Sequence, residues 1–140
     1  MRLLIIRHAT AVPRGTPDMP DEERPLTKRG ERRFRRAADG LARLTKRPDT
    51  LLSSPLSRAR RTAEIAAKAW GKVEVEESPA LAGGSYDEVA TALGRFPAES
   101  MVAIVGHEPD LSALLDVPGS LAEGGTLVWY APPRILRRLA

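Results

Sequence analysis

Two histidines are the only imidazoles in this 140-residue chain, and each directly follows an apolar stretch typical of a buried strand. His8 comes after LLIIR, and His107 comes after MVAIVG. Arg58 lies in the segment SSPLSRARRTAEI, residues 53–65, which also begins where a predicted strand ends. In open α/β sheets ligands bind beyond the carboxyl ends of the strands, so neighbouring strands would bring these side chains into one crevice.

Together with Arg7, which directly precedes His8, these residues suit a pocket for a tetrahedral dianion. An arginine presents paired N–H groups that match phosphoryl oxygens, and a neutral imidazole can attack phosphorus. Either histidine alone is equally well explained as a structural residue. For the two arginines at positions 60 and 61, a solvated helix face is the simpler explanation. The combination at the strand ends favours an anion pocket.

Five short runs rich in β-branched residues or leucine predict strands. They are Arg2–Ile6, Asp49–Ser53, Val73–Val75, Met101–Val105 and Thr126–Tyr130. The segments between them carry helical patterns instead. The first predicted helix follows Thr27 as its N-cap and ends near Thr45, with apolar residues at helical spacing on one face and arginines on the other.

The second predicted helix takes Ser54 as its N-cap and Pro55 as its first helical position, and Gly71 ends it. A third helix opens with a capping box, because Ser85 and Glu88 have the required spacing. A short fourth helix is predicted to start near residue 109. Residues 8–25 lack periodicity and are rich in proline and glycine, which is typical of a long functional loop.

Strands that alternate with helices predict an α/β fold, a three-layer α/β/α sandwich with a mostly parallel central sheet. We expect a single domain over residues 1–140, since the length suits one hydrophobic core. The chain has no cysteine, and its N-terminus has no apolar run long enough for a signal or membrane segment. A cytoplasmic monomer with no membrane contact is therefore expected.

The charge of the chain is uneven. Residues 1–70 hold 17 basic and 8 acidic residues, whereas residues 71–140 hold 5 and 10. This asymmetry is compatible with an anionic partner but identifies none. A module that binds nucleic acid or phosphate without catalysis is one alternative. Only 4% of the residues are aromatic and no nucleic-acid motif is present, which disfavours nucleic acid.

Three motifs, RHATA, SSPLSRARRTAEI and GHEPDL, occur in an order that resembles the histidine phosphatase superfamily, also called the phosphoglycerate-mutase-like family. The stretch DEERPLTKRG, residues 21–30, is similar to the D-x-x-R-P-L-T-x-x-G pattern of the short SixA-type phosphohistidine phosphatases, and the ending PPRILRRL resembles theirs. The resemblance spans essentially the whole chain and implies an α/β fold with phosphatase activity.

The resemblance further implies that His8 is the nucleophile and forms a phosphohistidine intermediate. Arg7, Arg58 and a protonated His107 would complete the catalytic pocket and bind the substrate phosphate. No metal or other cofactor is expected, because the acids are scattered and no pair of carboxylates follows a strand. A phosphate or sulfate ion is expected to fit the pocket. The expected partner is a phosphohistidine-bearing signalling or phosphotransfer protein, which an acidic surface would steer toward the basic half of the chain.

One departure from the wider family bears on the substrate. Mutase and bisphosphatase branches place a Glu after the strand that follows the second helix, where it protonates a leaving alkoxide. The corresponding stretch here, SPALAGGSY, contains no acid. A leaving imidazole has a pKa of about 6.5 and needs less help than an alkoxide, so P–N cleavage is favoured over P–O cleavage.

A phosphatase for small phosphomonoesters remains the alternative function. It would need another general acid, and the nearest candidates are Asp87 and Glu88, which are more simply the first turn of a capped helix. Thr10 and Asp21 could line the pocket through the long loop. A turn residue and a loop salt bridge explain them equally well.

Overall fold

A computed structural model gives the structure of residues 1–115 and 126–127. The strands in this part of the chain are β1 (Arg2–Arg7), β2 (Thr50–Ser53), β3 (Val75–Glu77), β4 (Met101–Gly106) and β5 (Thr126–Leu127). The helices are α1 (Lys28–Leu44), α2 (Ser57–Ala69), α3 (Tyr86–Gly94) and α4 (Asp110–Leu115). Single 3-10 turns lie at Asp21–Glu23 and Pro79–Leu81. Strands and helices therefore alternate, as the sequence predicts.

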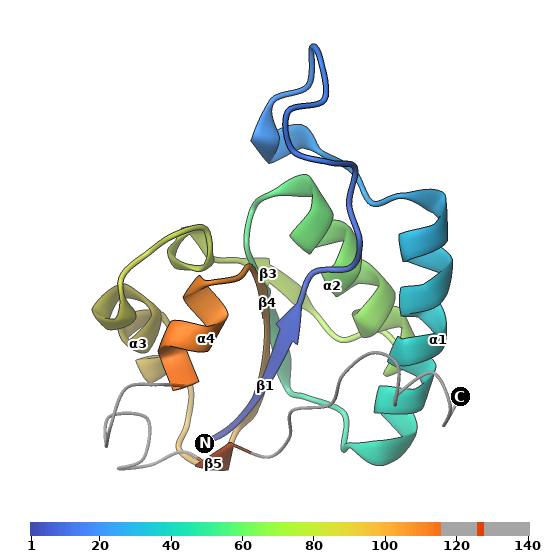
Figure 1. Ribbon diagram of the computed structural model, residues 1–140. Helices are drawn as coiled ribbons and strands as arrows, with labels where there is room; N and C mark the ends of the chain where they lie inside the picture. Colours follow the sequence, from blue (N-terminus) through green and yellow to red (C-terminus); the bar gives the residue numbers. More distant parts are fainter. Residues whose placement is uncertain (116–125, 128–140) are drawn as a thin grey trace.

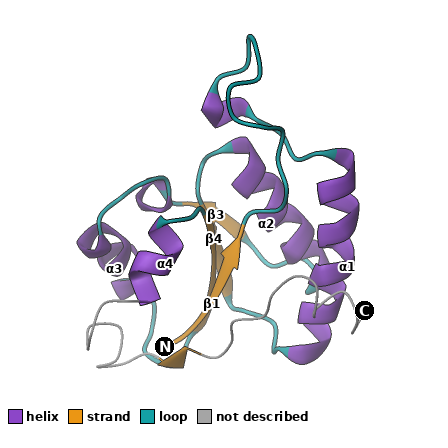
Figure 2. Cartoon of the chain, in the orientation of Figure 1, coloured by secondary structure: helices purple, strands orange, loops and turns teal. Residues whose placement is uncertain are grey.

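The strands form one parallel sheet in the order β3-β2-β4-β1-β5. Helices α1 and α2 cover one face of this sheet, and α3 and α4 cover the other (Figure 1; Figure 2). The predicted three-layer α/β/α sandwich is confirmed. Because all the strands are parallel, their carboxyl ends meet at a single edge.

Two apolar cores lie on the two faces of the sheet, and the strands feed both by alternation. In β1, Leu4 points to the core under α1 and α2, whereas Leu3 points to the core under α3 and α4. Strand β4 is buried throughout its length, as expected for the centre of a parallel sheet. This double burial gives the strand ends a rigid base.

Two of the predicted helix starts are confirmed by their caps. The Thr27 hydroxyl accepts a hydrogen bond of 2.9 Å from the backbone N–H of Gly30 at the start of α1. At the start of α3, Ser85 and Glu88 form both hydrogen bonds of a capping box. Each cap satisfies backbone donors that a helix leaves unpaired in its first turn.

Two predicted boundaries are wrong. The second helix begins at Ser57 with Leu56 as its N-cap, so Ser54 does not cap it. The third strand begins at Val75 and not at Val73, because the N–H of Val73 donates to the carbonyl of Ala67 in the turn that ends α2. Of the predicted strand 126–130, only the first two residues lie within the described part of the chain.

The loop of residues 8–25 projects beyond the carboxyl edge of the sheet (Figure 1). An antiparallel bridge between Ala11 and Leu26 closes its base, and the N–H of Val12 donates to the carbonyl of Pro25 at 2.9 Å. The predicted long loop is therefore anchored at both ends, next to the strand end that carries His8.

Gly30 is required where this loop meets α1. The Thr10 carbonyl oxygen accepts from the N–H of Thr27 at 3.0 Å. A Cβ atom at position 30 would overlap that same oxygen, which is backbone and cannot swing away. The glycine at position 30 therefore allows the start of α1 to pack directly against the segment that follows His8.

We expect Gly30→Ala to destabilise the fold by about 1–3 kcal/mol, because the clash outweighs the better helix propensity of alanine. Gly94→Ala is the matched control, since Gly94 ends α3 and a Cβ there meets nothing within 4 Å. Urea unfolding of the three proteins measures the difference. Equal stability of the two variants would contradict the expectation.

Candidate active site

His8 lies immediately after β1, at the carboxyl edge of the sheet. Its N–H donates to the carbonyl of Gly106 at 3.0 Å and so continues the pairing of β1 with β4. Its Nδ1 lies 2.7 Å from the carbonyl oxygen of Ala9. Because a carbonyl can only accept, Nδ1 carries the proton and Nε2 keeps its lone pair. The neutral imidazole is thus set up as a nucleophile through Nε2.

His107 lies next to His8, at the end of the neighbouring strand β4. The two ring centroids are 4.9 Å apart, with a tilt of 51° between the planes. His107 is buried, and its Nε2 lies 2.8 Å from the hydroxyl of Ser54. Its Nδ1 has no hydrogen-bond partner among the described residues. Both predicted imidazoles therefore share one crevice.

Ser54 fixes the state of His107. The Ser54 oxygen accepts from the N–H of Leu56 at 3.3 Å, and in the described part of the chain its own proton has no acceptor other than His107. Donation of that proton to Nε2 leaves Nδ1 as an N–H group. The arrangement leaves the Nδ1–H of His107 buried and without an acceptor among the described residues.

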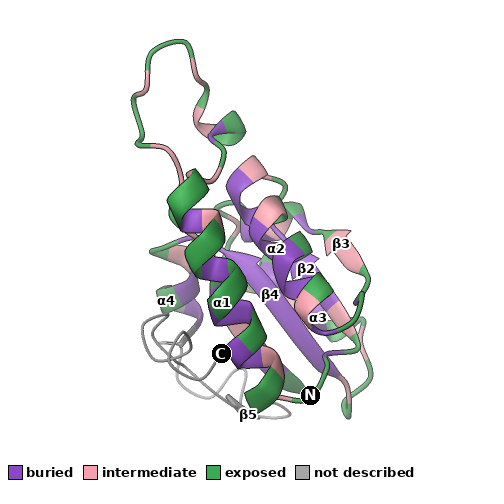
Figure 3. Cartoon of the chain, turned by 90° about the vertical axis from the view of Figure 1, so that its right-hand side faces the viewer, coloured by how far each residue is buried: buried purple, intermediate pink, exposed green. Residues whose placement is uncertain are grey.

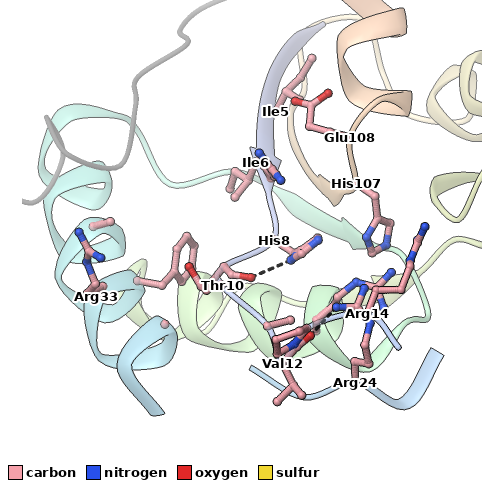
Figure 4. Close-up of a pocket in the computed structure, with 18 of the residues that line it drawn as sticks. Ile5, Ile6, His8, Thr10, Val12, Arg14, Arg24, Arg33, His107 and Glu108 are labelled. Atoms are coloured by element: carbon pink, nitrogen blue, oxygen red, sulfur yellow. Dashed lines mark hydrogen bonds between the residues drawn. The ribbon is translucent and has the colours of Figure 1, made fainter. Parts of the chain in front are cut away.

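Arg58 lies in the first turn of α2 with its side chain only 4% exposed. One terminal nitrogen donates to the backbone carbonyl of Asp21 at 2.6 Å, and the other donates to the Asp21 carboxylate at 3.0 Å. The guanidinium is thereby held in a fixed orientation by the loop. Figure 4 shows the cavity in which these side chains meet.

Asp21 is the centre of a cluster of arginines. Its carboxylate accepts from Nε of Arg14 at 3.0 Å and from Nε of Arg24 at 2.9 Å, in addition to Arg58. Burial alone would raise the pKa of Asp21, but the hydrogen bonds from Arg14 and Arg24 and the charge of Arg58 lower it to about 2. Asp21 is therefore ionised at neutral pH.

Arg7 completes the set as the exposed last residue of β1. All four predicted residues, Arg7, His8, Arg58 and His107, line one cavity of about 790 Å³. The cavity continues between β1 and α1 along apolar side chains. The structure thus brings together every residue that the sequence singled out for the pocket.

Burial, with help from the surrounding positive charges, keeps both imidazoles neutral. Burial lowers the pKa of His8, and the positive charges of Arg58 and Arg7 add to this effect, against the opposing hydrogen bond to Ala9. Burial, the neighbouring His8 and the charge of Arg58 lower the pKa of His107 to about 4. The expectation of a protonated His107 is therefore wrong for the free protein, because burial and the nearby positive charges outweigh the opposing charge of Asp21.

Several residues of the site escaped the sequence analysis. Ser54 was predicted to cap a helix, and Arg24 was not singled out, yet Arg24 is buried and donates to the carbonyl of Val12. Thr62 is fully buried, accepts from the N–H of Ala9 at 3.0 Å and donates to the carbonyl of Arg58 at 2.7 Å. The local signal for Ser54 was its place directly after a strand, which His8 and His107 share.

Asp87 and Glu88 do not line the cavity. The Glu88 carboxylate accepts from the N–H and hydroxyl of Ser85, and these hydrogen bonds lower its pKa. The predicted capping role is confirmed for Glu88. Among the described residues, no group of three or more His, Cys, Asp or Glu side chains is placed to hold a metal ion. No helix in the described ranges is long and apolar enough to cross a membrane.

Fold and site together define an α/β protein with an anion-binding pocket built from imidazoles and guanidinium groups. The sequence matches the histidine phosphatase superfamily (branch 1) over residues 3–99, which is more than half of the chain. This chain therefore belongs to the histidine phosphatase superfamily, and its expected family and phosphatase chemistry are confirmed at that level.

Known proteins similar to the chain support the same family. It is 38% identical to an uncharacterized protein of Picosynechococcus sp. over 114 residues, which cover 79% of this chain and 68% of that protein. A proposed phosphohistidine phosphatase SixA from Agrobacterium tumefaciens superposes with a TM-score of 0.72 at 26% identity, covering 81% of this chain and 73% of the other. The protein histidine phosphatase SixA complexed with tungstate gives 0.73 at 27% identity, covering 84% and 78%.

We expect Ser54→Ala to lower kcat by about tenfold, because His107 loses the hydroxyl that orients its ring. Ser53→Ala is the matched control, since Ser53 is equally buried but its hydroxyl bonds only the carbonyl of Ser54. Ser53→Ala removes one buried hydrogen bond and should destabilise the fold by about 1–2 kcal/mol, whereas Ser54→Ala removes two, with Leu56 and with His107, and should cost somewhat more. Steady-state kinetics and urea unfolding separate the two effects. A similar loss of kcat in both variants would count against the orienting role of Ser54.

The pKa of His107 predicts a loss of stability in mild acid. The unfolded chain gains a proton near pH 6.5 and the folded chain only near pH 4, so protons stabilise the unfolded state between these values. The free energy of unfolding should therefore fall more steeply from pH 6.5 to pH 4 in the parent than in His107→Asn. Parallel urea titrations test this, and identical pH profiles would show that His107 is not the group responsible.

Proposed function

We propose that this chain is a metal-independent phosphohistidine phosphatase that acts on a phosphohistidine-bearing signalling or phosphotransfer protein. The observation that carries the proposal is the His8 imidazole, whose Nδ1 proton is engaged by Ala9 and whose Nε2 is free within a pocket of arginines. The similarity to SixA proteins, one of which binds the tetrahedral oxyanion tungstate, supports the same chemistry.

The reaction begins with attack of His8 Nε2 on the phosphorus of the bound phosphohistidine. A bond forms between Nε2 and phosphorus, and the bond from phosphorus to the substrate imidazole breaks. The lowered pKa of His8 keeps the attacking imidazole unprotonated at neutral pH. Arg7 and Arg58 balance the charge on the equatorial oxygens, and His107, which lines the same cavity beside His8, is the third group that would bind them.

In the second half of the reaction, water attacks the phosphohistidine formed on His8. The bond between phosphorus and Nε2 breaks, inorganic phosphate leaves and His8 returns to its neutral form. The proton released by the water balances the proton that the departing substrate imidazole takes up from solvent. The arginines bind the same oxygens in both steps, so the site serves both half-reactions without rearrangement.

The carboxylates near the pocket favour P–N cleavage over P–O cleavage. Asp21, with a pKa of about 2, has no proton to give at neutral pH. Glu108 lines the cavity, but its carboxylate accepts from the N–H and hydroxyl of Ser112 and points away from His8 and His107 (Figure 4). No acid in the described part of the site is therefore placed to protonate an alkoxide, whereas an imidazole leaves without such help.

Phosphate release in the presence of EDTA tests the proposal. We expect the parent protein to hydrolyse a phosphohistidine-bearing phosphotransfer domain and to prefer it over a panel of small phosphomonoesters. His8→Ala should reduce turnover by at least about 1000-fold, because it removes the nucleophile. Acid-labile labelling of the parent, absent from His8→Ala, would identify the intermediate. Hydrolysis of the esters alone would favour the phosphomonoesterase alternative and would call for a general acid elsewhere.

A further inference from the structure

A stripe of arginines runs along the outer face of α1. Arg29, Arg32, Arg33 and Arg36 are all exposed and follow the spacing i, i+3, i+4 and i+7, which places them on one side of the helix. We call these residues the arginine stripe. Figure 3 shows the exposed turns of α1 on the outside of the molecule, between the long loop and the far end of the helix.

The arginines of the stripe have no acidic partner among the described residues. Other arginines of the same region do, because Arg35 and Arg61 both pair with Glu31, and Arg61 also pairs with Glu64. Like charges three and four residues apart on a helix destabilise it by a few tenths of a kcal/mol per pair. The chain thus neutralises the charges beside the stripe but leaves the stripe itself positive.

The stripe also reaches the active-site cavity. Arg33 is among the residues that line the same cavity as His8 and Arg58, on the side that α1 forms (Figure 4). At about 1.5 Å per residue, the whole stripe from Arg29 to Arg36 extends about 10 Å along the helix. A molecule whose phosphoryl group occupies the pocket would therefore lie with its neighbouring surface against α1.

From this arrangement we infer that the arginine stripe is a docking surface for an acidic protein segment beside the phosphohistidine of the substrate. The inference rests on the proposed function, since it places the partner by its phosphoryl group. Carboxylates within about two helical turns of the phosphohistidine match the length of the stripe. Exposed charge pairs of this kind mainly raise the rate of association.

Two other anionic partners fit the stripe less well. The apolar residues of α1, such as Phe34 and Leu41, are buried against the sheet, so the helix has no apolar face for a membrane surface. Phe34 is the only aromatic residue of α1 and is 9% exposed, so α1 offers no platform for base stacking. A protein segment with carboxylates fits best, because it can bind the arginine stripe through charge alone.

The test uses two helical phosphohistidine peptides of identical length, with Glu in one and Gln in the other at the positions flanking the phosphohistidine. At low salt we expect the parent to hydrolyse the Glu peptide with a kcat/KM about tenfold higher, mainly through KM. At about 300 mM salt the preference should largely disappear. The triple variant Arg29→Gln/Arg32→Gln/Arg36→Gln should lose the preference and keep its rate on the Gln peptide within about twofold.

The matched control is Lys46→Gln/Lys68→Gln/Lys72→Gln, which removes the same charge from exposed residues near the C-terminal ends of α1 and α2. It should retain the preference. Loss of the preference in both triple variants would assign the effect to net charge and overturn the docking surface. Circular dichroism and thermal unfolding check that each variant is folded.

Binding of the two peptides to His8→Ala separates the docking surface from the proposed function. Hydrolysis of both peptides at equal rates, with equal affinities, would overturn the docking surface alone. Tighter binding of the Glu peptide without hydrolysis by the parent would overturn the proposed activity and still support the surface. Binding of duplex DNA or phosphatidylserine vesicles that exceeds binding of the Glu peptide, and that depends on the stripe, would overturn the inference in favour of those partners.

Discussion

The parallel pairing of β1 with β4 is the constraint on which the site depends. The register sets Arg7 opposite Gly106, and the N–H of His8 extends the pairing by one further hydrogen bond. His8 and His107 therefore leave adjacent strands at the same level and reach ring contact without help from a flexible loop. Both strands are held by cores on two faces, so the separation of the imidazoles is fixed by the most buried part of the fold.

Around this pair, the protein concentrates positive charge without charging the imidazoles themselves. Five guanidinium groups, those of residues 7, 14, 24, 33 and 58, line the cavity, and the Asp21 carboxylate joins three of them, Arg14, Arg24 and Arg58. The same cations that attract a phosphoryl group hold down the pKa of each histidine. Burial is the larger cause of both lowered pKa values, and the cations that attract the substrate add to it.

Much of this site could be predicted from the sequence, because its main residues share a local signature. Each of His8, Arg58 and His107 follows an apolar strand, and the carboxyl ends of parallel strands meet at one edge. The fold class and the capped starts of α1 and α3 are encoded in equally local patterns. Such local patterns can be recognised without any knowledge of tertiary contacts.

The remaining features could not be predicted because they depend on contacts distant in sequence. Asp21 and Arg58 are 37 residues apart, and Ser54 and His107 are 53 apart. The pattern Ser-Pro before a helix is typical of an N-cap, but here the hydroxyl is directed to an imidazole from another strand. The charge state of His107 likewise follows from burial beside cations, which the order of residues does not reveal.

The loop of residues 8–25 can change at its tip without a change at its base. The Ala11–Leu26 bridge closes its base, and the hydrogen bonds from Arg14 and Arg58 to Asp21 hold the two sides together, so residues 15–20 form a tip held at both sides. Lengthening a loop whose ends are already fixed costs little entropy. A recognition sequence could therefore be grafted or exchanged at the tip, while the residues at the base of the loop keep their positions beside the active site.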